Sequence, residues 1–177
     1  MKQLELPGMP KMPRPEKTDP ETIEEFKKIV LGKLNAYYPG EENEEIADYA
    51  VRQVAEYRVI DGYQLAKKLD NEYCLEGDVG LVEMLDDFDY DLDTAYWRII
   101  KEWVISQCIE PHFKLGDKVR ICLLKGEYIQ GEVAEIYKDK ARAVIYCESL
   151  GHVREGNGTH GTIKNYEEIE LIDGDSE

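Results

Sequence analysis

The sequence predicts an α+β protein, in which an N-terminal helical domain is followed by a small antiparallel β-barrel. The chain has 177 residues, which is room for one domain or two small ones. Apolar residues recur at steps of three and four up to Pro111, and the period shortens to two after it. We therefore divide the chain into a proline-rich tail (1–18), an acidic helical domain (19–110) and a barrel (112–173).

The tail and the first helix are separated by a clear helix-start signal. Prolines 7, 10, 13 and 15 favour an extended segment, because proline lacks a backbone donor. Thr18 is expected to cap the first helix, with Pro20 in its first turn and Glu21 completing a Thr-x-x-Glu box. The expected apolar stripe of this helix consists of Ile23, Phe26, Ile29, Val30 and Leu34.

Four further helices are expected before Pro111, which must end the last one. Their expected positions are a start at Asn43 as cap, a short helix from Gln64 to Leu69, a start near Asp78, and a start at Asp91 or Asp93 as cap. Five helices of this length are what a compact bundle of about 90 residues needs.

After Pro111, short alternating segments are separated by Gly, Asp or Asn, as in small barrels. The expected strands cover 118–123, 129–137, 141–147, 161–164 and 168–172. The segments KLGDKVRI, GEVAEIY, ARAVIYC and GTIKNYEEIELI resemble an SH3-like barrel of the KOW and Tudor-like kind, over Lys114 to Ile172. The resemblance implies a module that binds proteins or nucleic acid, although a fold alone does not define a function.

The charge of the chain is strongly negative. There are 38 acidic and 22 basic residues, a net charge of −16, and the segment 19–110 holds 23 acidic against 9 basic residues. Nucleic acid is therefore not expected to bind the surface as a whole. There is no apolar run of membrane-spanning length, no signal-peptide pattern and no disulfide framework among four scattered cysteines, so we expect a cytoplasmic protein.

The densest acidic segment holds Asp86, Asp87, Asp89, Asp91 and Asp93. If it were extended, the last four would share one face at a spacing of about 6.8 Å and repel one another, which suggests a cationic partner. The alternative is a turn between helices, in which Asp91 or Asp93 is a helix cap. A calcium loop is not expected, because the required Gly and Glu positions are not filled.

A second acidic cluster contains Glu41, Glu42, Glu44 and Glu45. These four residues open a helix, where negative charge is stabilising, so they form either a second part of a partner-binding surface or an ordinary solvated helix start.

No motif for a reaction, a cofactor or a metal is present, and we expect a protein that is not an enzyme. Cys122, Cys147, His152 and His160 are suitable zinc donors, but their spacing matches no zinc motif. The segment Gly151–Gly161 lacks the Gly-Lys-Ser/Thr of a phosphate loop and is interpreted as a long hairpin, alternatively as a binding loop.

The tail contains one short motif. Gln3-Leu4-Glu5-Leu6-Pro7 resembles the bacterial sliding-clamp-binding peptide, in which a Gln and spaced leucines enter an apolar pocket. It departs from that pattern at Gly8, where an apolar residue is expected, although Met9 could replace it.

In size, charge and lack of catalytic motifs, the chain resembles the small inhibitors that phages and mobile elements make against host defence, of the anti-CRISPR or anti-restriction type. The resemblance is one of general character and implies a protein that occupies the basic nucleic-acid groove of a nuclease, with Cas9 as first candidate. The alternative is an accessory module that binds DNA or RNA directly. It would use the barrel residues Lys114, Lys118, Arg120, Lys125, Lys138, Lys140 and Arg142. The oligomeric state is left open.

Overall fold

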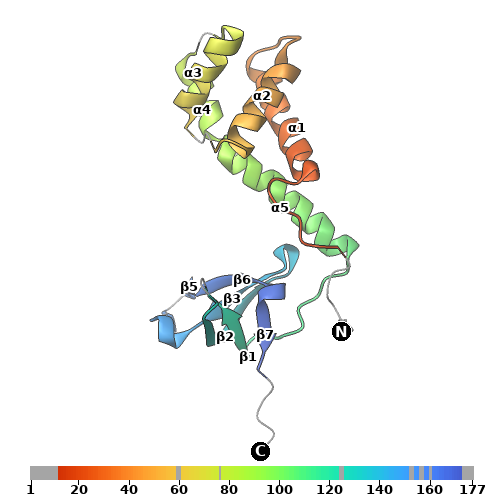
Figure 1. The fold of residues 1–177 in the computed structure, drawn as a ribbon, viewed down its shortest axis with the longest axis vertical. Coiled ribbons are helices and arrows are strands. Elements are labelled where there is room, and N and C mark those ends of the chain that lie inside the picture. Colours follow the sequence, from red (N-terminus) through yellow and green to blue (C-terminus); the bar gives the residue numbers. More distant parts are fainter. Residues whose placement is uncertain are drawn as a thin grey trace, which may run out of the picture. The chain divides into compact units, whose positions relative to one another are not determined.

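The computed structural model describes residues 12–58, 61–75, 77–123, 126–151 and 161–172, together with the backbone of 154–155 and 158–159. The chain forms two compact units: a helical unit of residues 14–100, and a second unit that holds residues 101–177 together with 1–13. The two parts of the α+β prediction, helices first and antiparallel strands second, are confirmed (Figure 1).

Helix α1 (Pro20–Tyr37) begins with proline in its first turn, as predicted, but Asp19 and not Thr18 holds the N-cap position. The Asp19 carboxylate accepts a hydrogen bond from the backbone N–H of Glu16, 2.8 Å away, so it closes the turn before the helix and does not cap it. The side chains of Phe26, Val30 and Leu34 are fully buried, which confirms the apolar stripe.

Helix α2 (Asn43–Ala55) begins one residue earlier than predicted. Glu42 is its N-cap, and the predicted cap Asn43 lies inside the helix with its side chain buried. The Asn43 amide donates to the Asn35 side chain at 2.8 Å and to the Tyr38 carbonyl at 2.6 Å. It therefore satisfies groups at the end of α1 instead of the first N–H groups of α2.

Helices α3 (Gly62–Tyr73) and α4 (Val79–Asp86) both start after an aspartate cap. Asp61 accepts from the backbone N–H of Gln64, and Asp78 accepts from that of Leu81, each at 2.8 Å. The start near Asp78 is confirmed, whereas α3 is longer at both ends than predicted.

Helix α5 (Phe88–Ser106) starts before Asp91 and Asp93, so the prediction that one of them caps it is wrong. The Phe88 side chain is fully buried and meets the ring of Phe26 edge-on, with the ring centroids 6.1 Å apart. Burial of Phe88 is the physical reason for the early start. The helix ends before Pro111, as predicted.

The second unit contains a five-stranded antiparallel sheet in the order β6-β3-β2-β1-β7 (Figure 1). Its strands are β1 (Lys118–Cys122), β2 (Tyr128–Tyr137), β3 (Arg142–Tyr146), β6 (Thr162–Asn165) and β7 (Ile169–Leu171), close to the five predicted segments. The described residues form an open sheet in which β6 and β7 are the two edges. Its core includes Val119, Ile121 and Ile145, together with Trp103 and Phe113 from outside the sheet.

The predicted hairpin at Gly151–Gly161 contains two short strands. β4 (Arg154–Glu155) and β5 (Gly158–Thr159) pair antiparallel as a separate two-stranded sheet. His152 and His160 lie outside the described residues, so the suggestion of a binding loop stays a prediction.

Candidate partner-binding surface

The acidic segment 86–93 is not extended. Asp86 ends α4, Asp87 follows it, and Asp89, Asp91 and Asp93 lie in the first turns of α5. The backbone N–H of Asp91 donates to the carbonyl of Asp87 at 2.9 Å, which is a helical contact. Because helical side chains turn by about 100° per residue, these carboxylates do not form one row. The arrangement expected for an extended segment is therefore wrong.

Three of the five aspartates have a lysine within 4.0 Å, and the ion pairs of Asp91 and Asp93 join α5 to preceding segments. Asp91 is only 6% exposed, and its Oδ2 lies 2.6 Å from the Nζ of Lys33 on α1. Asp93 forms an ion pair with Lys17, just before α1. Asp91 is therefore not accessible to a partner, and loss of Lys33 would leave its buried carboxylate without a cation.

Four accessible aspartates lie at the contact between the start of α3 and the segment that joins α4 to α5. The backbone N–H of Gly62 lies 2.5 Å from Oδ1 of Asp86, so the start of α3 touches the end of α4. Asp61, Asp86, Asp87 and Asp89 are all exposed at this place, which we call the acidic junction. The Nζ of Lys33 lies 3.5 Å from Oδ2 of Asp87.

Two exposed tyrosines belong to the same elements as the acidic junction. Tyr63 follows Gly62 on α3 and is 66% exposed, and Tyr90 follows Asp89 on α5 and is 74% exposed. Tyrosine combines a large apolar ring with a polar hydroxyl, and the face of the ring attracts cations. Rings and carboxylates together are the chemistry that favours a partner rich in arginine.

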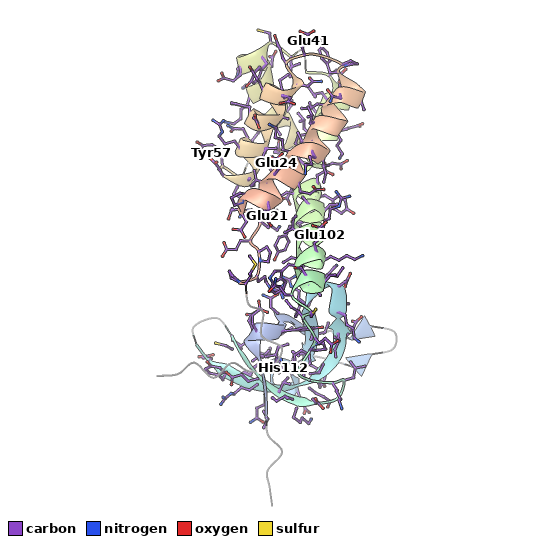
Figure 2. All side chains as sticks on the ribbon, turned by 90° about the vertical axis from the view of Figure 1, so that its right-hand side faces the viewer. Glu21, Glu24, Glu41, Tyr57, Glu102 and His112 are labelled. Atoms are coloured by element: carbon purple, nitrogen blue, oxygen red, sulfur yellow. The ribbon has the colours of Figure 1, made fainter. Side chains whose placement is uncertain are left out.

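Glu41, Glu42, Glu44 and Glu45 are exposed at the start of α2, as predicted, and Glu41 is labelled in Figure 2. Within the described part of the chain, none of the four forms an ion pair within 4.0 Å, although the negative charge of Glu44 helps to raise the pKa of Lys27, after the larger effect of Asp48. The cluster adds to the negative potential of the helical unit, and its position at a helix start explains why it is tolerated.

At least five of the ten lysines and arginines of the helical unit form ion pairs with its own acids. Residues 14–100 contain 22 acidic and 10 basic residues. Ion pairs join Lys17, Lys27, Lys28, Lys33 and Arg98 to Asp93, Asp48, Glu25, Asp91 and Glu25, respectively. Acids such as Glu21 and Glu24, both exposed on α1 in Figure 2, carry the excess negative charge.

Two of the predicted basic residues of the sheet have a carboxylate beside them. Lys118 lies 3.2 Å from Glu132, and Arg120 lies 2.5 Å from Glu170. Arg142 donates to the side chain of Asn165 at 2.8 Å, and Lys125 lies outside the described residues. Lys114 and Lys138 are exposed, and Lys140 is half-buried. Neighbouring carboxylates thus neutralise the basic strand β1.

Of the four suggested zinc donors, the structure describes Cys122 and Cys147, whereas His152 and His160 lie outside the described residues. Cys147 is buried, which raises the pKa of its thiol, and Cys122 is half-buried. In the residues that the structure describes, no group of three or more His, Cys, Asp or Glu side chains is arranged to hold a metal ion. The clamp-like motif Gln3–Pro7 lies outside the described residues, so it too stays a prediction.

Comparisons of the chain with protein-family models, curated proteins and solved structures find no match. Across the described ranges, no helix has both the length and the apolar character needed to cross a membrane. A function must therefore be argued from the surfaces themselves.

Sequence reasoning found Asp86, Asp87 and Asp89 but not the rest of the junction. Asp61 is not among the predicted site residues, because nothing local indicates that its neighbour Gly62 contacts Asp86. The signal that could have found the contact is Gly62, since a glycine at a helix start often permits a close backbone approach.

Proposed function

We propose that this protein is a non-enzymatic inhibitor, of the kind made by phages or mobile elements, that occupies the basic nucleic-acid groove of another protein. A Cas9-type nuclease is the first candidate target. The observation that carries the proposal is the excess of exposed carboxylates in the helical unit, concentrated at the acidic junction beside Tyr63 and Tyr90. Complementary charge speeds association and selects basic partners.

The contacts at the junction indicate which carboxylates would meet the partner. Asp87 and Asp89 are exposed and, among the described residues, accept no hydrogen bond from a backbone N–H group, whereas Asp61 and Asp86 each accept one. Asp91 is buried. We therefore assign the contacts to Asp87 and Asp89 first, with Glu41, Glu42, Glu44 and Glu45 as a second group.

We further propose that the sheet is an SH3-like barrel. After the meander of β1, β2 and β3, the last strand β7 returns to pair with β1, which brings the two ends of the segment into one sheet. The register of β2 against β3 shifts between Val133 and Glu135, and such a bulge bends a strand. Both features support a strongly curled sheet.

The test measures binding of the full chain to a purified Cas9-type nuclease without its guide RNA, at low salt. We expect Asp87→Asn/Asp89→Asn to weaken binding at least about tenfold, the effect of about 1.4 kcal/mol. The matched control is Glu127→Gln/Glu148→Gln, which removes the same charge from exposed positions of the other unit. Equal weakening by both variants, or by neither, would reject the acidic junction as the site, and lack of binding by the wild type would remove Cas9 as target.

One observation favours the alternative function, direct binding of nucleic acid. The guanidinium carbon of Arg120 lies 5.1 Å from the centre of the Tyr128 ring, and this tyrosine is exposed. An aromatic ring beside an arginine is suited to stacking of a single-stranded base. Filter binding of labelled single-stranded DNA and RNA to the full chain tests it: retention that is lost in Tyr128→Ala would favour this function over the inhibitor.

A further inference from the structure

A surface groove of about 650 Å³ lies in the second unit, beside the end of α5. Its walls are mainly apolar and are formed by Val104, Ile109, Pro111, Phe113, Leu115 and Ile136. A groove of this volume is in the range that accommodates several side chains. None of its lining residues belongs to the acidic junction, so the groove is independent of the surface discussed above.

The groove carries a protruding apolar side chain as well as a hollow. Leu115 lies on its wall and is 65% exposed, while Phe113, two residues earlier on the same wall, is buried. An exposed leucine costs free energy of hydration, which burial in a partner would recover. The same surface therefore presents an exposed apolar side chain, Leu115, and an apolar groove that could receive one.

The charges around the groove are balanced. Lys114 and Lys138 contribute two positive charges, and Glu110 and Asp139 contribute two negative ones. In the described residues, none of these four side chains forms an ion pair within 4.0 Å. A rim with two positive and two negative charges favours neither an anionic nor a cationic partner. It is complementary to a surface that also carries both positive and negative charges.

The wider charge distribution also permits two copies to meet here. The segment 112–172 contains 10 acidic and 9 basic residues, whereas 19–110 contains 23 acidic and 9 basic ones. Repulsion between copies is therefore weakest at the sheet segment and strongest between the helices.

We propose that the groove is the interface of a homodimer, with a second copy of this chain as its occupant. A two-fold axis places the same patch on both sides, so the patch must complement itself. Leu115 of each copy enters the groove of the other, and the lysines of each rim face the carboxylates of the other rim.

The first test is the mass of the full chain measured by light scattering and sedimentation from about 1 µM to about 1 mM. The wild type is expected to reach twice the mass of one chain as concentration rises. Leu115→Asp is expected to raise the dimer dissociation constant at least about tenfold, while Leu150→Asp, which changes an exposed leucine outside the groove, leaves it unchanged.

The second test uses charge reversal of exposed rim residues. Lys114→Glu/Lys138→Glu leaves a rim with four negative charges, and Glu110→Lys/Asp139→Lys leaves one with four positive charges. Each variant alone is expected to be a monomer, and an equimolar mixture is expected to restore a dimer of one chain of each kind. Restoration by mixing also shows that both variants are folded.

Three results would overturn the proposal. They are a wild type that stays monomeric over the whole concentration range, a dimer that Leu115→Asp does not weaken, and a mixture of the two charge variants that stays monomeric. If the groove binds a different protein instead of a second copy, the purified wild type stays monomeric, and this result also overturns the proposal.

Discussion

The backbone N–H of Gly62, at the start of α3, donates a hydrogen bond to the carboxylate of Asp86, at the end of α4, over 2.5 Å. The contact holds the acidic junction together, and it depends on the absence of a side chain at residue 62. A Cβ there would lie 2.7 Å from the backbone nitrogen of Asp86 and still closer to the carbonyl oxygen of Val82. Neither backbone atom can move aside cheaply.

Gly62→Ala is therefore expected to destabilise the helical unit by about 1–3 kcal/mol, the usual cost of overpacking. The control is Gly32→Ala, in the middle of α1, where no atom lies within 4 Å of the added Cβ. This change is expected to stabilise the helix by about 1 kcal/mol, because alanine is the better helix former. Urea unfolding followed by circular dichroism measures the free energy of unfolding of both variants. A change of the same sign in the two variants would contradict the role of the close approach at Gly62.

Removal of the ammonium group that faces Asp91 is expected to destabilise the protein. Lys33→Met leaves a buried carboxylate without its cation, at a cost of about 1–3 kcal/mol. Lys28→Met is the matched control on the same helix, since Lys28 is well exposed and pairs with Glu25 at 3.4 Å. Its effect on the free energy of unfolding should stay within about 0.5 kcal/mol. A cost as small for Lys33→Met would show that Asp91 has another partner.

The pKa of Asp78 is expected to depend on Tyr37. The hydrogen bond from the Tyr37 hydroxyl, followed by that from the backbone N–H of Leu81, lowers the pKa of Asp78 below its ordinary value of 3.8. A lowered pKa means that this carboxylate contributes stability above pH 3.8, and that the contribution is lost as the pH falls through the lower folded value.

Titration of the Asp78 carboxyl carbon by NMR measures this effect. In Tyr37→Phe the pKa of Asp78 should rise towards 3.8, and the stability that Asp78 contributes above this pH and loses in acid should be smaller than in the wild type. Tyr38→Phe serves as the control, because Tyr38 is exposed and forms no side-chain bond to Asp78 in the described structure. An unchanged pKa in Tyr37→Phe would mean that the backbone bond alone lowers it.

The four cysteines are expected to react with a thiol reagent at very different rates. Cys74 and Cys108 are exposed, and Cys147 is buried with its thiol pKa raised by burial, so little of it is present as reactive thiolate. Mass spectrometry after brief alkylation of the native protein should find the first two modified and Cys147 unmodified until urea is added. Early modification of Cys147 would show that the sheet core opens readily.

The strands were predictable because alternation of side chains is a local property. Val119, Ile121 and Ile145 are buried as their alternation or apolar run indicates. Helix caps were less predictable, because Asn43 and Asp91 have side chains that are engaged by α1 and not by their own helix. Competition from distant partners overrides a local propensity, and a sequence does not display those partners.

In the candidate site, too, local features were predictable from the sequence and contacts between distant segments were not. Composition alone predicted an acidic helical unit, and the exposure of Asp87 and Asp89 agrees with it. The junction with Asp61 and the groove beside Leu115 depend on contacts between segments far apart in the chain. Such contacts follow from packing in three dimensions and have no counterpart in local spacing.

The ion pairs of Asp91 with Lys33 and of Asp93 with Lys17 reduce the electrostatic potential that these two aspartates produce away from the protein surface. A carboxylate beside an ammonium group is a dipole, whose potential falls off more steeply with distance than that of a single charge. Beyond a few ångströms, these two ion pairs therefore contribute little to the electrostatic potential that an approaching molecule meets. Asp89 is a single charge without such a neighbour in the described structure, and its field persists over about one Debye length. Of the aspartates on α5, Asp89 therefore contributes most to the steering of a charged partner, whereas Asp91 and Asp93 mainly attach α5 to the segments that hold Lys33 and Lys17.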